Sequence, residues 1–204
     1  MANDIETVCK LMVSDGNAQL EKYEKEQAKK GNKAKSMRLF LSRNPSSGVR
    51  TPEEQAKEVL AQKSWTCSGS HMSDSARHVG AKIDGKTYTN MSFKKVVTKE
   101  DYDKFIDVYD AAMKKQNLCN FTKKPGFLPN SMDPFHVELK NSRLADSDPR
   151  VQKCLLIYAK ATREGGKKRN EKFEKENPAA KKFLETYDKA KGDFPARSSS
   201  DRLA

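Results

Sequence analysis

The residues best suited to chemistry in this chain are its few cysteines and histidines. Cys67, His71 and His78 share one Ser-rich segment, and Cys119 follows later. Zinc in proteins is bound tetrahedrally by side chains of these types. The C-x3-H-x6-H spacing matches no compact zinc module, however. We therefore expect no cofactor and keep Cys67, His71, His78 and Cys119 only as weak metal-ligand candidates.

A cysteine nucleophile is the second chemistry to consider. Cys119 and His136 flank one proline-rich segment, but no third residue that would orient the histidine is evident. The chain also contains no GxGxxG, P-loop, HExxH or GxSxG motif. We expect a protein that is not an enzyme. An enzyme with an unfamiliar Cys/His site is an alternative.

Charge is the strongest functional signal. The formal net charge is +12, while charged residues make up 33% of the chain and hydrophobic residues 35%. A basic balance of this size suits a polyanionic partner such as RNA or DNA. The alternative is a lysine-rich surface that only keeps the protein dissolved.

The basic residues gather in three segments, residues 32–50, 82–99 and 160–175. The first contains five basic residues and no acidic one. The residues expected to contact nucleic acid are Lys33, Lys35, Arg38, Arg43, Arg50, Lys82, Lys86, Tyr88, Lys94, Lys95, Lys167, Lys168 and Arg169. Whether the three segments meet in one groove is not decided by the sequence.

Aromatic residues are interspersed among these cations. Phe40 lies between Arg38 and Arg43, and Tyr88 and Phe93 lie among lysines. Basic grooves with aromatic platforms bind single strands, because phosphates attract cations and unstacked bases stack on rings. Single-stranded RNA is therefore favoured over duplex DNA. The alternative is that Phe40 and Phe93 are core residues.

Hydrophobic periodicity and capping residues predict a mainly α fold. Helix starts are indicated at Thr51, Thr98, Asp148–Pro149 and Asn177–Pro178. We expect an irregular helical domain of about six to seven helices over residues 1–192. One small β-hairpin is expected near residues 79–91, around an Asp84–Gly85 turn, and a disordered tail at 193–204.

Three further segments carry weaker signals. Residues 14–17 predict a turn or kink between two N-terminal helices. Residues 33–42 predict a short third helix, with Met37, Phe40 and Leu41 facing inward. The Ser-rich residues 66–78 predict a loop, which is also the candidate sub-boundary within the domain.

The cysteines and the hydropathy of the chain indicate the compartment in which we expect the protein. The four cysteines are widely separated and form no CxxC pair, so we expect reduced thiols. The sequence contains no apolar stretch of ~18 residues, so no transmembrane helix is expected. Met1–Val13 does not resemble a signal peptide. The expected location is intracellular and cytoplasmic, or inside a particle assembled in the cytoplasm, without membrane contact.

These observations favour a non-catalytic nucleic-acid-binding structural protein, for example a coat or nucleocapsid-like RNA-packaging subunit that self-associates. Packaging requires many phosphate contacts and little base reading. A helical adaptor or inhibitor that docks on a protein partner is the alternative. That alternative depends on the aromatic segment 121–135 and on a last helix with Phe183, Leu184 and Tyr187 on one side.

Overall fold

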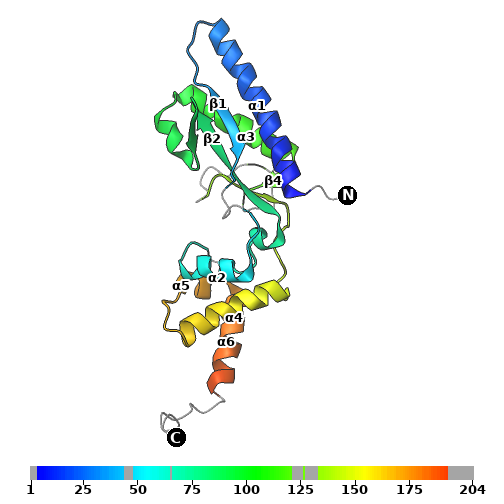
Figure 1. Cartoon of the computed structure of the whole chain (residues 1–204), viewed down its shortest axis with the longest axis vertical. Helices are drawn as coiled ribbons and strands as arrows, with labels where there is room; N and C mark the ends of the chain where they lie inside the picture. The colour runs from blue at the N-terminus through cyan, green and yellow to red at the C-terminus, as the bar shows by residue number, and fades with distance from the viewer. Residues whose placement is uncertain (1–3, 44–47, 65, 121–125, 127–132, 193–204) are drawn as a thin grey trace. The chain divides into compact units, whose positions relative to one another are not determined.

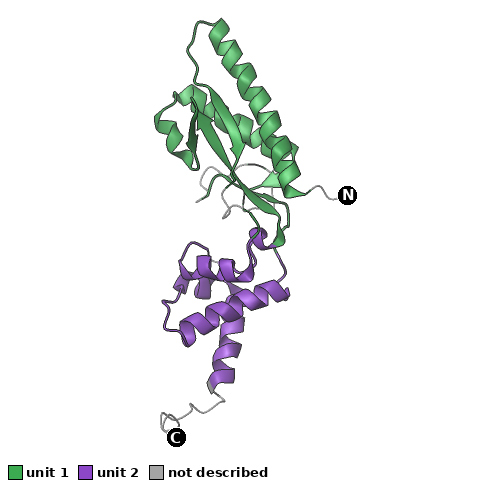
Figure 2. Ribbon diagram, viewed as in Figure 1, with its two compact units in different colours: residues 1–49, 73–143 green, residues 50–72, 144–204 purple. Residues whose placement is uncertain are grey.

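A computed structural model describes residues 4–43, 48–64, 66–120, 126 and 133–192. The chain divides into two compact units, each made of two chain segments (Figure 2). Unit 1 comprises residues 1–49 and 73–143, and unit 2 comprises residues 50–72 and 144–204. The chain passes between the units at residues 49–50, 72–73 and 143–144.

Unit 1 combines two long helices with an antiparallel sheet (Figure 1). Its elements are α1 (Ile5–Lys29), β1 (Met37–Leu41), β2 (Ala76–Ile83), β3 (Lys86–Tyr88), the 3-10 helix η3 (Met91–Lys95), α3 (Lys99–Lys115), β4 (Leu118–Cys119) and β5 (His136–Leu139). The described strands run in the order β1-β2-β5-β4, and β3 also pairs with β2. In the described part of the sheet, β1 is therefore an edge strand.

The core of unit 1 lies between the helices and one face of the sheet. Leu39 pairs with Ala81 and Met37 pairs with Ile83, and all four side chains are buried. They pack in one cluster with residues of α1, α3 and η3, including Phe93. Because side chains alternate along a strand, the residues between them face away from this core.

Unit 2 is helical. It contains α2 (Pro52–Leu60), α4 (Pro149–Arg163), α5 (Glu171–Glu176) and α6 (Pro178–Gly192), and the short 3-10 helix η2 (Ser70–Ser73) begins in it. Its core brings together residues such as Val59, Leu155, Tyr158 and Phe173. A Cys67–Cys154 disulfide ties the two chain segments of this unit together.

Local capping signals correctly predicted the starts of α2, α3, α4 and α6. The Thr51 side chain accepts a hydrogen bond from the Glu54 N–H in a complete capping box. Thr98 and Asp148 cap α3 and α4. The β-hairpin is also confirmed, since β2 and β3 pair on either side of Asp84–Gly85. The described residues contain six α-helices.

The mainly α prediction is too narrow, because the fold is mixed α and β. Residues 37–41 form β1 and not part of a helix. The run MRLFL is short and nearly continuously apolar, a pattern that periodicity alone assigns poorly. The 66–78 segment is not simply a loop either, since it contains η2 and the start of β2. The expected tail at 193–204 lies outside the described residues.

The predicted turn at residues 14–17 is also wrong, because the 25-residue helix α1 continues through it. Its turn-forming residues serve the packing of β1. A Cβ on Gly16 would lie 2.5 Å from a methyl carbon of Leu39, so glycine permits close approach. The Asn17 side chain donates to the Leu39 carbonyl and accepts from the Leu39 N–H. Among the described residues, no helix has the length and apolarity to cross a bilayer.

Candidate nucleic-acid interface

The face of the unit 1 sheet that points away from its core carries a distinct set of side chains. Arg38 pairs with Lys82, Phe40 pairs with Gly80, and Lys82 also pairs with Thr87 on β3. We call this set the outer face (Arg38, Phe40, Gly80, Lys82, Thr87). The strand register alone brings together an aromatic ring, two cations and a hydroxyl from three strands.

Phe40 belongs to the outer face and not to the core. It is only partly buried and lies outside the hydrophobic cluster of unit 1. Its ring crosses Gly80, whose missing side chain provides the space: a Cβ there would lie 2.5 Å from the ring atoms Cε1 and Cζ. The prediction of Phe40 as an inward helix residue is therefore wrong.

Four lysines surround the β2–β3 hairpin. Lys82, Lys86, Lys94 and Lys95 are all exposed, and no carboxylate of the described residues forms an ion pair with any of them. The 3-10 helix η3 packs on β3 through a contact between the Tyr88 and Phe93 rings, 6.1 Å apart. This hairpin patch (Lys82, Lys86, Lys94, Lys95) therefore combines cations from three consecutive elements.

The two aromatic residues of this region differ. Tyr88 is half-buried, and the Lys86 ammonium lies 5.6 Å from its ring centre, a cation–π distance. Phe93 is fully buried among Tyr102, Phe105 and Phe135. Phe93 is thus a core residue and offers no stacking surface, whereas Tyr88 and Phe40 are partly accessible.

The first basic segment is already partly neutralised. Lys35 forms a 2.7 Å ion pair with Asp84. Arg38 lies 3.4 Å from a Glu21 carboxylate oxygen and 3.0 Å from one of Glu24. Lys33 and Arg43 are exposed, whereas Arg50 belongs to unit 2. Two of the five basic residues of this segment are therefore engaged in ion pairs, and one belongs to the other unit.

A groove of about 900 Å³ runs beside β1 in unit 1. Val13, Leu39, Phe40 and Leu41 contribute its apolar lining, and Glu6, Lys10, Arg43 and Arg77 are the charged residues around it. Ser42 donates its N–H to the His78 carbonyl on β2. The backbone N–H and C=O of the neighbouring residue Leu41 therefore point away from β2. The groove thus follows the edge of a strand and is bordered mainly by cations.

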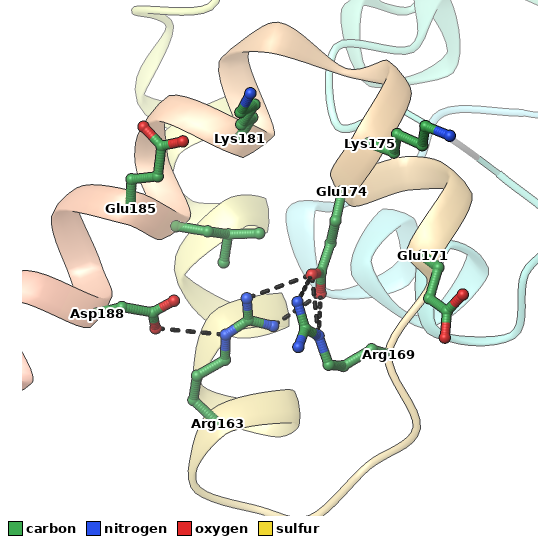
Figure 3. Close-up of a pocket in the computed structure, with 9 residues that line it drawn as sticks. Arg163, Arg169, Glu171, Glu174, Lys175, Lys181, Glu185 and Asp188 are labelled. Carbon is green, nitrogen blue, oxygen red and sulfur yellow. Dashed lines mark hydrogen bonds and ion pairs between the residues drawn. The ribbon is translucent and has the colours of Figure 1, made fainter.

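The third basic segment lies in unit 2, beside a cavity of about 420 Å³ (Figure 3). Arg169 and Arg163 both bind the carboxylate of Glu174, which also accepts a hydrogen bond from Tyr158. Partial burial alone raises the pKa of Glu174, but the hydrogen bonds from Arg169, Arg163 and Tyr158 outweigh it and lower the pKa from 4.5 to about 2.

This cluster removes Arg169 from the set of available cations. Its guanidinium is held by an internal carboxylate, while Lys167 and Lys168 are exposed. The basic segments 82–99 and 160–175 belong to different units. The hairpin patch lies within unit 1 alone, and in the described part of the chain none of its lysines forms an ion pair.

The weak metal candidates divide between the units. Cys67 is bonded to Cys154, so it is no thiolate ligand, and the expectation that all four cysteines are reduced is wrong. His71 is buried in unit 2. Cys119 is buried on β4 of unit 1, with its Sγ 3.5 Å from the Glu138 carbonyl. Burial raises the pKa of the other unbonded cysteine, Cys9, to about 12.

His78 instead lies beside His136, in a polar cluster of unit 1 that the sequence reasoning missed. His78 pairs with His136 across β2 and β5. Burial lowers the pKa of His136. Asp133 and Glu138 each contact one of the two imidazoles. The alternation His136-Val137-Glu138 was a usable signal, since it places acid and imidazole on one face of a strand.

Comparisons with known proteins leave the function open. No protein-family model, curated protein or solved structure matches this chain at a significant level.

Proposed function

We propose that this protein binds single-stranded nucleic acid, RNA in particular, through the outer face and the hairpin patch of unit 1. The observation that carries the proposal is the placement of Phe40. An aromatic ring outside the core lies on the same sheet face as Lys82, next to a group of lysines without ion pairs. Rings that accept stacked bases and cations that bind phosphates are what a single strand requires.

The proposed role is structural and not enzymatic, as for a coat or nucleocapsid-like subunit that self-associates on RNA. Lysines make flexible, sequence-independent contacts with phosphates, which suits packaging more than base reading. The Cys67–Cys154 disulfide favours an oxidising environment. A cytoplasmically assembled particle that is later released would meet that condition, and we prefer it to permanent residence in the cytoplasm.

The test is fluorescence anisotropy of labelled single-stranded RNA and of duplex DNA with the full chain across a salt series. Changing all four hairpin-patch lysines to glutamine should reduce the slope of log K against log salt by about 3, given roughly 0.7 per phosphate contact on single strands. Single-stranded RNA should bind more tightly than the duplex, because only unpaired bases reach Phe40 and Tyr88.

The matched control changes four other unit 1 lysines to glutamine. Lys10, Lys22, Lys99 and Lys114 each form an ion pair with a carboxylate four residues away on the same helix. The control has the same net charge as the patch variant but keeps the patch. An equal decrease of the slope of log K against log salt in both variants would reject the proposal. So would the absence of RNA binding by the unaltered chain at low salt.

The groove beside β1 supports a second candidate, the docking of an acidic, extended peptide from a protein partner. The outward-facing backbone groups of Leu41 can bind an added segment, whereas Asn17 already binds those of Leu39. Exposed Arg43 is the cation that would attract its acidic side chains, since the other two cations at the groove are ion-paired. A pull-down that survives nuclease and high salt, and that Arg43→Glu abolishes, would favour this function. A partner that is no longer captured after nuclease treatment would favour the first function, nucleic-acid binding.

A further inference from the structure

Two histidines face each other across neighbouring strands of unit 1. His78 on β2 and His136 on β5 are directly opposed partners in the antiparallel ladder. Their ring centres are 5.3 Å apart with an interplanar angle of 69°, and a ring nitrogen of one lies within 4.8 Å of a ring nitrogen of the other. The side chain of His136 is 3% exposed and that of His78 is 21% exposed. The pair is therefore built into the sheet and open to solvent on the His78 side.

Each imidazole is oriented by its own carboxylate. Nε2 of His78 is 2.7 Å from Oδ2 of Asp133, and Nε2 of His136 is 3.1 Å from Oε2 of Glu138. Histidines that bind metal ions commonly donate one ring N–H to a carboxylate, which fixes the ring and its tautomer. A carboxylate at Nε2 favours the tautomer whose lone pair is on Nδ1, the form that coordinates a metal ion.

The charge of the cluster also favours a cation. With neutral imidazoles, the carboxylates of Asp133 and Glu138 contribute two negative charges, and Glu138 is only 5% exposed. A buried ion pair is weak evidence for stabilisation, because desolvation offsets the attraction. Two imidazoles and two carboxylates gathered around one opposed pair of strand positions therefore call for an explanation other than packing, and a divalent ion would compensate their charge.

Asn120 provides an independent observation. Its amide nitrogen donates to the His136 carbonyl at 2.6 Å and to the Asp133 carbonyl at 3.0 Å. Its Oδ1 is buried and has no hydrogen-bond partner among the described residues. Orphaned buried acceptors point to an unseen water or ion. This one belongs to a side chain that already contacts the segment carrying His136 and Asp133.

We propose that His78 and His136 bind one divalent transition-metal ion of the zinc class. Imidazole suits zinc, nickel, copper and iron, whereas calcium and magnesium prefer sets of oxygen ligands. Zn–N bonds are about 2.0–2.1 Å, so a small rotation of the rings brings both nitrogens to one ion. Water completes the coordination, while Asp133 and Glu138 stay at Nε2 of the two rings. The ion joins β2 to β5, and the proposal is independent of nucleic-acid binding.

The test uses the full chain after chelator treatment and dialysis. Titration with Co²⁺ should give one set of visible d–d bands that saturates at one ion per chain, and Zn²⁺ should displace it. Calorimetry with Zn²⁺ should give a micromolar Kd. Zn²⁺ at about 100 times its Kd should raise the unfolding temperature by about 5 °C, because it binds only the folded chain.

Two variants and one control, all with intact circular dichroism, complete the experiment. His78→Gln, at the more exposed of the two positions, should weaken Zn²⁺ binding at least 50-fold. Asp133→Asn should weaken it about 10-fold to 100-fold through loss of ring orientation. Asp74→Asn, which removes an exposed carboxylate paired with Arg77, should leave the Zn²⁺ affinity unchanged. Absence of Co²⁺ bands in the unaltered chain, or unchanged Zn²⁺ affinity in His78→Gln, would overturn the proposal.

Discussion

Phe40 lies across Gly80 of the neighbouring strand, with two of its ring carbons 2.5 Å from the position that a Cβ on Gly80 would occupy. The same Cβ would lie 2.8 Å from the Tyr88 carbonyl oxygen, which belongs to the backbone of β3 and cannot move aside cheaply. Gly80 therefore allows β1, β2 and β3 to keep their register while a large ring covers the outer face. The proposed stacking platform depends on this one glycine.

Gly80→Ala should destabilise unit 1 by about 1–3 kcal/mol, the usual effect of overpacking a close contact. Urea unfolding followed by circular dichroism measures the change. Gly69→Ala in unit 2 is the matched control, because its nearest neighbour is a side-chain atom at 3.6 Å. We expect the control to stay within about 0.5 kcal/mol of the unaltered chain. A Gly80→Ala variant as stable as the control would show that Phe40 does not occupy the space above Gly80.

Phe40→Ala should weaken single-stranded RNA binding by about tenfold, since a base stacked on an aromatic ring contributes roughly 1–3 kcal/mol. Duplex DNA binding should change little, because paired bases do not reach the ring. Phe40→Tyr keeps the stacking surface and is expected to bind as the unaltered chain does. Anisotropy titrations at fixed salt compare the three proteins. Equal losses for RNA and duplex would mean that Phe40 acts through the fold and not through stacking.

Much of the fold follows from local sequence, and the missing part is non-local. Thr51, Thr98 and Asp148 cap helices because their own side chains meet nearby N–H groups, so short motifs identify them. The pairing of β1 with β2 depends on residues about forty positions apart. Gly16 and Asn17 look like turn residues until Leu39 packs against them. Patterns read along the chain do not contain that information.

In the candidate site, too, local sequence predicted some features, while others depend on non-local contacts. The lysines of the hairpin patch were identified from composition and a local turn motif, and they do lie together on consecutive elements. The neutralisation of Arg38 by Glu21 and Glu24, and the pairing of His78 with His136, arise from tertiary contacts. Charge counting along the sequence gives an upper limit on the cations available to a ligand.

Reduction of the Cys67–Cys154 disulfide should destabilise unit 2 selectively. A disulfide limits the unfolded chain more when it closes a longer loop, and these cysteines are 87 positions apart. We expect a loss of about 3 kcal/mol, less than the full loop would give because the described part of residues 73–143 of unit 1 is ordered within it. Hydrogen exchange should accelerate in α4 and remain unchanged in α3.

The control for this experiment is the double variant Cys67→Ser and Cys154→Ser. It should exchange like the reduced protein, with or without reductant, since no disulfide remains. If the reductant accelerates exchange in the double variant as well, the effect does not come from this bond. Exchange that accelerates equally in α3 would mean that the two units do not unfold separately.

Glu174 should make the stability of unit 2 depend on acid pH. Its folded-state pKa of about 2 lies below the ordinary value of 4.5, so its carboxylate stabilises the fold fully above pH 4.5. That contribution decreases as the pH falls from 4.5 toward 2 and the folded-state carboxylate becomes protonated. The difference corresponds to at most about 3 kcal/mol, and we expect about 2 because Arg169 is exposed to solvent.

Glu174→Gln should therefore lose about 2 kcal/mol of unfolding free energy at pH 7 and progressively less at lower pH, until it matches the unaltered chain near pH 2. Urea unfolding at several pH values measures the two curves. Glu171→Gln is the control, because Glu171 lies on the same short helix and beside the same cavity but is exposed (Figure 3). A constant difference between Glu174→Gln and the unaltered chain from pH 7 to pH 2 would show that the ionised carboxylate is not what the two arginines require. The cluster would then stabilise α4 and α5 through neutral hydrogen bonds and packing.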